Sequence, residues 1–87
     1  MDYKKLGSIC KYYRKHIAQI TVKEMGTQCR ENYKSLSAFE NGRANNIRYI
    51  FDYFLILDSV HRRDFLSDIF YEGGIDEWKL QVMNIKL

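Results

Sequence analysis

The chain has 87 residues, of which 46% are hydrophobic and 29% are charged; this composition is typical of one globular domain and excludes a disordered chain. It has five glycines and no proline, which favours an all-α fold, because small strand-rich domains need more turn residues. No apolar run is long enough for a signal peptide or for a membrane span of about 20 residues.

Charge is distributed unevenly along the chain. Residues 1–48 contain ten Lys or Arg and four Asp or Glu, whereas residues 49–87 contain four and seven. The basic part could meet a polyanion and the acidic part could not. A solvated basic face without a partner is the alternative interpretation of the same pattern.

No pattern of catalytic or metal-binding residues is found in the sequence. Cys10 and Cys29 have no ligand spacing to His16 or His61, and no glycine-rich phosphate loop follows a strand. Both cysteines are expected to be small buried hydrophobic residues in a reducing cytosol. We therefore expect a protein that is not an enzyme and that has no metal or other cofactor.

Apolar periodicity and capping residues predict five helices. Apolar residues recur at helical spacing in each segment, and a residue that can cap a helix precedes each one. The expected helices cover about residues 3–16, 22–29, 32–40, 46–57 and 60–71, with a connection at 16–20 and with caps at Asp2, Thr21, Asn32, Asn45–Asn46 and Ser59.

Particular residues sharpen these assignments. Thr21 and Glu24 have the spacing of a capping box. Gly26 lies in mid-helix, where glycine costs about 1 kcal/mol relative to alanine, so we expect a tight helix–helix crossing in which another backbone approaches it closely. Gly42 can adopt the left-handed conformation that ends a helix. The expected inward residues of the fourth helix are Ile47, Ile50, Phe51, Phe54 and Leu57.

The sequence divides into a helical body, residues 1–72, and a tail, residues 73–87. Two consecutive glycines separate them, and the apolar residues Trp78, Leu80 and Val82 then alternate with polar ones. This alternation has the period of a strand. A short irregular apolar tail is the alternative.

Two short helices joined by a tight turn describe a helix-turn-helix. The segments LGSICKYYR (6–14), TVKEMG (21–26) and LSAFENGR (36–43) follow one another here. In this order they resemble the Cro and lambdoid-repressor type of helix-turn-helix family, over about residues 5–60. The resemblance implies a five-helix repressor-like domain in which the helix at 32–40 enters the major groove of DNA.

The chain departs from the pattern of that family at four places. Arg30 occupies the position of the usual turn glycine, and Glu31 that of the following apolar residue. Val22 replaces a polar residue that often contacts phosphate, and one extra residue lies between the first two helices. The departures at Arg30 and Glu31 leave two alternatives open, a distorted turn or a different course of the second helix, and the one at Val22 removes a phosphate contact.

The resemblance also implies roles for individual residues. Lys34 could donate to guanine, Ser37 could donate or accept, and Tyr33 could touch a thymine methyl group or a phosphate; for each of them, a solvated side chain is the alternative. Arg14 and Glu40 are expected to form a structural ion pair. The base-contact candidates are Asn32, Tyr33, Lys34 and Ser37, and the phosphate-contact candidates are Lys23, Asn41, Arg43, Asn45 and Arg48.

We therefore expect a sequence-specific regulator of transcription, a repressor of phage or mobile-element type, that binds double-stranded DNA as a homodimer. Dimers of this motif read half-sites about one helical turn apart. A tail that covers the core of its own monomer is the alternative to dimerisation, and a protein-binding inhibitor of a host factor is the alternative function. The expected dimer contacts are Phe65, Phe70, Tyr71, Trp78, Leu80 and Val82.

Overall fold

The computed structural model describes residues 2–72, which form five α-helices and one π-helical segment. The elements are α1 (Tyr3–Tyr12), η1 (Tyr13–Ala18), α2 (Val22–Cys29), α3 (Tyr33–Glu40), α4 (Tyr49–Leu55) and α5 (Ser59–Glu72). Residues 2–72 contain no strand, and the expected all-α class is confirmed for this part of the chain. The tail at 73–87, with its expected strand, lies outside the described residues.

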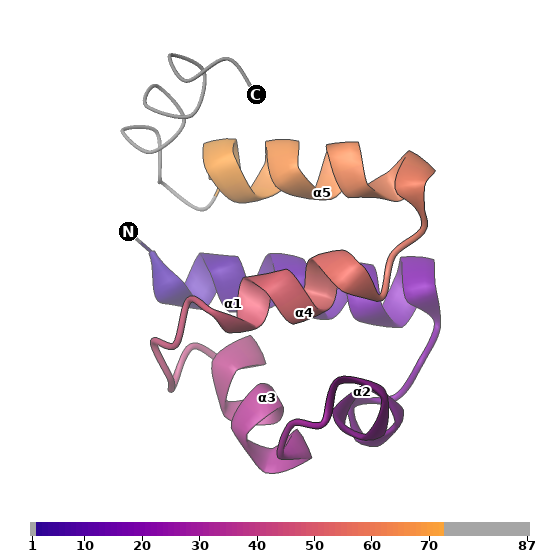
Figure 1. Cartoon of the computed structure of the whole chain (residues 1–87). Helices are drawn as coiled ribbons and strands as arrows, with labels where there is room; N and C mark the ends of the chain where they lie inside the picture. The colour runs from indigo at the N-terminus through magenta and orange to yellow at the C-terminus, as the bar shows by residue number, and fades with distance from the viewer. Residues whose placement is uncertain (1, 73–87) are drawn as a thin grey trace.

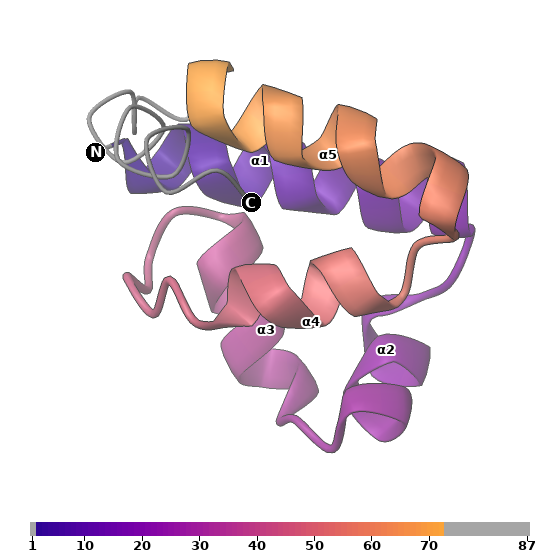
Figure 2. The same cartoon turned by 45° about the horizontal axis from the view of Figure 1, so that its top comes forward.

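The helices are arranged around α1, which contacts both α3 and α5. The α1–η1 helix runs alongside α5 (Figure 2), and α4 also packs against α5. α2 and α3 pack against each other at the end of the molecule farthest from α5 (Figure 1). Among the described helices, none has the length and apolarity needed to cross a membrane.

All five α-helices contribute side chains to one hydrophobic core, whose burial from water stabilises the fold. Cys10 is fully buried as expected, whereas Cys29 is only half-buried. The side chains with the least exposure are Leu6, Cys10, Met25, Leu36, Phe39, Tyr53, Phe65 and Ile69.

The predicted inward face of the fourth helix is wrong at one residue. Phe51 is 68% exposed, and Tyr53 is fully buried instead. The helix begins at Tyr49 because Asn46 caps a preceding turn, accepting from the Arg48 amide at 3.2 Å. Tyr53 can be buried because its hydroxyl group has a buried partner, Glu40, at 2.7 Å.

The helix caps are confirmed for the first three α-helices and corrected for the last. The Thr21–Glu24 capping box forms in both directions, at 2.9 and 3.1 Å. Asp2 and Asn32 accept from the first turns of α1 and α3. At α5 the cap is Asp58, which accepts from the His61 amide at 2.9 Å, and Ser59 is already helical.

The expected connection at 16–20 is wrong, because the first helix continues to Ala18 with π-helical hydrogen bonds. The helix then ends at Gln19, whose left-handed conformation (φ 58°) turns the chain towards α2. A π turn contains one residue more than an α turn. The π-helical segment therefore holds one more residue in this turn of the first helix than an α-helix would.

The turn between α2 and α3 keeps the second helix on its expected course. Arg30 adopts the left-handed conformation (φ 56°) that a glycine would adopt there, and its amide donates to the carbonyl of Gly26. For a non-glycine residue this conformation costs about 1–2 kcal/mol. A Cβ atom on Gly26 would lie 2.9 Å from the Glu31 carbonyl oxygen, so the close backbone approach predicted at this glycine is confirmed.

Candidate nucleic-acid interface

The exposed side of α3 borders an open depression of about 310 Å³. Tyr33, Lys34 and Ser37 line it together with Arg43. The structure therefore brings together three of the four base-contact candidates and one phosphate-contact candidate. Sequence reasoning missed two further lining residues, Val22 and Ala38.

The orientation of α3 follows from its cap and its buried face. The fourth base-contact candidate, Asn32, accepts from the Lys34 amide at 2.8 Å and so begins the helix. Leu36 and Phe39 are fully buried against the core. Because helical residues three or four apart share a face, burial of these two side chains leaves residues 33, 34 and 37 on the outer side.

The depression is lined by two cationic side chains, Lys34 and Arg43, that are available to a binding partner. Lys34 and Arg43 are exposed, and within residues 2–72 neither side chain makes a hydrogen bond or an ion pair. Gly42 ends α3 with a φ of 74°, and the Arg43 amide then donates to the Ala38 carbonyl at 2.8 Å. This turn holds Arg43 beside the helix that carries Lys34.

Lys23 lies over the ring of Tyr33, with its ammonium nitrogen 5.3 Å from the ring centroid. The contact is a cation–π interaction, which contributes about 0.5–1 kcal/mol at an exposed site. It joins a phosphate-contact candidate to a base-contact candidate and fixes the start of α3 against α2. No sequence signal links residues ten positions apart on two different helices, so sequence reasoning could not find it.

The remaining phosphate-contact candidates lie around the end of α3 but do not line the depression. The Asn41 amide group donates to the Ser37 carbonyl at 2.9 Å and so caps the helix. Asn45 and Arg48 are exposed in the chain between α3 and α4. In this position they could contact the phosphate backbone of a DNA duplex that extends beyond the depression.

Arg48 also lies near a pair of carboxyl groups, Glu31 and Asp52. The pKa of Asp52 is raised to about 6, mainly by partial burial and secondly by a hydrogen bond with Glu31. The positive charge of Arg48 opposes this shift. Glu31, in the turn between α2 and α3, therefore acts on the ionisation of a carboxyl group on α4.

A buried polar cluster ties α1–η1, α3 and α4 together, and it confirms the expected ion pair. The Arg14 guanidinium donates to both carboxylate oxygens of Glu40, at 2.7 and 3.0 Å, and to the Ile20 carbonyl at 2.8 Å. Tyr53 donates to the same carboxylate. Arg14 and Glu40 are 8% and 6% exposed, so the charges are screened little by solvent.

The ionisation of this cluster follows from its contacts. The hydrogen bonds to Glu40 raise the pKa of Arg14. The pKa of Tyr53 is raised mainly by burial and secondly by its hydrogen bond to Glu40. Gly7 lies directly against the carbonyl of Phe39, where a Cβ atom has no room. This close contact lets α1 approach α3 near enough for the ion pair to form.

The expected dimer contacts are only partly accessible. Phe65 is fully buried in the core of the monomer, which corrects its assignment as a contact residue, and Phe70 packs partly against that core. Tyr71 is 58% exposed, and Trp78, Leu80 and Val82 lie outside the described residues. The large exposed hydrophobic side chains that the prediction missed are Tyr12, Phe51, Leu55 and Val60.

Among residues 2–72 no cluster of His, Cys, Asp and Glu could hold a metal ion. Comparisons with protein-family models, with curated proteins and with solved structures find no match to this chain.

Proposed function

We propose that this protein is a sequence-specific regulator of transcription, a repressor of phage or mobile-element type, that binds double-stranded DNA. In this proposal α2, the turn at Arg30 and α3 act as a helix-turn-helix. α3 enters the major groove, where Tyr33, Lys34 and Ser37 meet base edges and Arg43 meets a phosphate. The protein acts by binding alone, without catalysis.

The observation that carries the proposal is the depression beside α3. Its two cations, Lys34 and Arg43, have no partner within residues 2–72, and no acid lies among its described lining residues. Within the same molecule Arg14 is buried and fully paired. Exposed cations on α3 and directly after it, at one end of the molecule, are complementary to the phosphates that border a groove of DNA.

The proposed active species is a homodimer, because one recognition helix offers only three or four side chains to base edges. Phe51 and Leu55 are four residues apart on α4 and are 68% and 61% exposed. They extend the proposed contact surface beyond the residues expected from the sequence. The same exposed pair favours the second candidate function, a domain that binds and blocks a host protein.

Titration of the protein with random-sequence duplex DNA at low and at higher salt tests the proposal. Neutralised phosphates release counterions, so the affinity should fall steeply as salt rises. Absence of binding to any duplex at low salt would rule out the proposed function. It would leave the protein-binding alternative, for which exposed Phe51 and Leu55 are the argument.

A further inference from the structure

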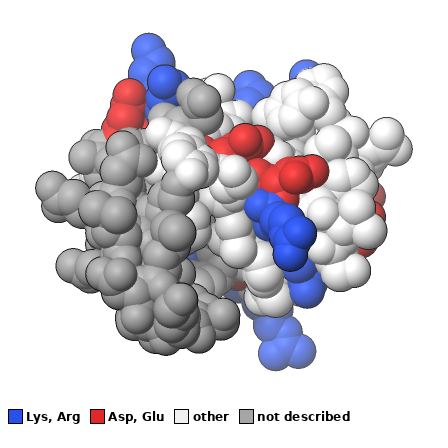
Figure 3. All heavy atoms as spheres, turned by 90° about the horizontal axis from the view of Figure 1, so that it is seen from above, with Lys and Arg blue, Asp and Glu red and all other residues white. Residues whose placement is uncertain are grey.

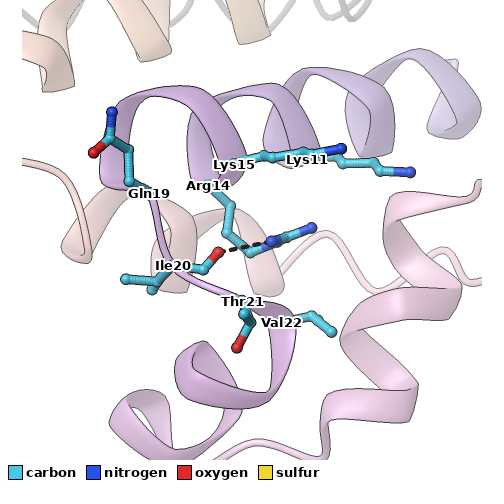
Figure 4. A pocket seen from close by; sticks show the side chains of 7 residues that line it. All are labelled: Lys11, Arg14, Lys15, Gln19, Ile20, Thr21 and Val22. Carbon is cyan, nitrogen blue, oxygen red and sulfur yellow. Dashed lines mark hydrogen bonds between the residues drawn. The ribbon is translucent and has the colours of Figure 1, made fainter.

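A second open groove, of about 470 Å³, lies between η1 and the N-terminal end of α2. Lys11 of α1 and Lys15 of η1 line it and extend alongside one another (Figure 4). Both lysines are exposed, and within residues 2–72 neither side chain takes part in a hydrogen bond or ion pair. They were not among the contact residues expected from the sequence.

The second groove adjoins the depression beside α3. Val22 lines both, and in Figure 4 its side chain points from the start of α2 towards α3. Lys11 and Lys15 therefore lie on one side of Val22, and Lys34 and Arg43 lie on the other. None of the described residues that line the second groove or the depression is an acid.

The face on the α5 side differs in charge. In the part of this face that residues 2–72 form, acidic and basic side chains lie next to one another (Figure 3). A polyanion that approached this face would meet both signs of charge. Lys11, Lys15, Lys34 and Arg43 line two adjoining hollows that share Val22, and this surface is complementary to a phosphate backbone.

Lysine side chains must supply the positive charge of the second groove. Its third cation, Arg14, is bound to Glu40 through two hydrogen bonds. The backbone amide of Thr21, at the start of α2, donates to the Glu24 carboxylate instead of pointing to a ligand. Lys11 and Lys15 remain as the cations that an incoming phosphate can reach.

We propose that Lys11 and Lys15 bind the sugar–phosphate backbone of the same duplex whose major groove receives α3. This inference rests on the proposed function and extends its contact surface across Val22. The apolar side chain of Val22 offers no donor to a phosphate, and the two lysines provide a charged contact from the neighbouring helix. The backbone then runs from Arg43, past Val22, to Lys11 and Lys15.

The test is the salt dependence of duplex binding by Lys11→Gln, Lys15→Gln and the double variant. Each lost phosphate contact reduces the slope of log K against log salt by about 0.9. We expect that reduction for each single variant and about twice as much for the double variant, with equal effects on unrelated duplexes. Arg63→Gln, an exposed site on α5, removes the same charge from another face and should leave the slope nearly unchanged.

The outcomes separate this inference from the function on which it rests. If the wild-type protein binds DNA with a steep salt slope and the double variant has the same slope, the proposed role of the lysines is overturned. The proposed function is not affected by that outcome. An equal loss of slope in Arg63→Gln would also overturn it, because the effect would then follow net charge. If the wild-type protein binds no duplex, the proposed function fails, and this inference fails with it.

Discussion

The buried cluster around Arg14 and the exposed depression beside Lys34 use charged residues in opposite ways. Arg14 donates to Glu40 and to a backbone carbonyl, and Tyr53 completes the cluster. Lys34 is exposed and has no side-chain partner within residues 2–72. One helix, α3, carries both Glu40 on its inner side and Lys34 on its outer side, six residues apart.

This difference separates charges that hold the fold from charges that are available to a partner. A buried charge is tolerated only when it is paired and hydrogen-bonded, and removing its partner is costly. An exposed charge contributes little to stability. Substitutions in the cluster should therefore change folding, and substitutions in the depression should change binding.

The largest effect is expected for Glu40→Ala, which leaves the Arg14 guanidinium buried without its carboxylate partner. We expect the free energy of unfolding to fall by about 3–5 kcal/mol, measured by urea denaturation. Tyr53→Phe keeps the ion pair and removes one hydrogen bond, so its cost should be only about 1–2 kcal/mol.

Arg43→Ala is the matched control for Glu40→Ala, since an exposed charge change should alter stability by less than about 0.5 kcal/mol. Equal losses from Glu40→Ala and Arg43→Ala would contradict the distinction between the two regions.

The second prediction concerns binding by two variants in the depression. Lys34→Ala should relax sequence preference by about 1–3 kcal/mol, because a base-edge contact is lost. Arg43→Ala should weaken binding to all duplexes alike, because a phosphate contact carries no sequence information. Affinities for a preferred and an unrelated duplex measure both effects. A uniform loss in Lys34→Ala would remove this residue from the base-reading face.

The third prediction uses the carboxyl pair of Glu31 and Asp52. The folded pKa of Asp52, about 6, lies above its ordinary value of 3.8, so the folded protein binds more protons between these values. Stability should therefore fall as the pH rises from about 4 to 6 and remain lower above pH 6. Asp52→Asn should stabilise the protein by roughly 1 kcal/mol at pH 7.5, allowing for solvent screening, and should do little at pH 4.

Thermal denaturation of the wild type and Asp52→Asn at the two pH values gives this comparison. A gain of the same size at both pH values would mean that ionisation of Asp52 is not its cause.

The smallest effect is expected for Arg30→Gly in the turn before α3. Arg30 has a φ of 56°, a conformation that glycine adopts without a steric penalty. We expect a stabilisation of about 0.5–1 kcal/mol after the greater flexibility of unfolded glycine is subtracted, measured by urea denaturation. Thr27→Gly, at an exposed site inside α2, should instead destabilise. A loss of stability in Arg30→Gly would show that its side chain supports the turn.

The sequence was sufficient for features that depend on near neighbours. The capping box of Thr21 and Glu24 depends on a spacing of three residues, and it was predicted. The left-handed conformation at Gly42 depends on the residue type alone, and it was also predicted. The ion pair of Arg14 and Glu40 was predicted only through the resemblance, because nothing in the spacing of residues 26 positions apart indicates a contact.

The features that the sequence did not reveal depend on tertiary structure. The choice of Tyr53 over Phe51 as a core residue depends on Glu40 being placed beside the Tyr53 hydroxyl. The π-helical end of the first helix brings Lys15 beside the start of α2. Periodicity reports the apolar face of each helix but not the neighbours that this face meets.

Selection of bound duplexes from a random DNA library tests the central claim most directly, that α3 reads sequence. We expect enrichment of one motif with two related half-sites about one helical turn apart, and loss of preference at particular base pairs when Lys34 is changed to alanine. A bound pool without sequence enrichment, or a Lys34→Ala pool identical to that of the wild type, would contradict the account.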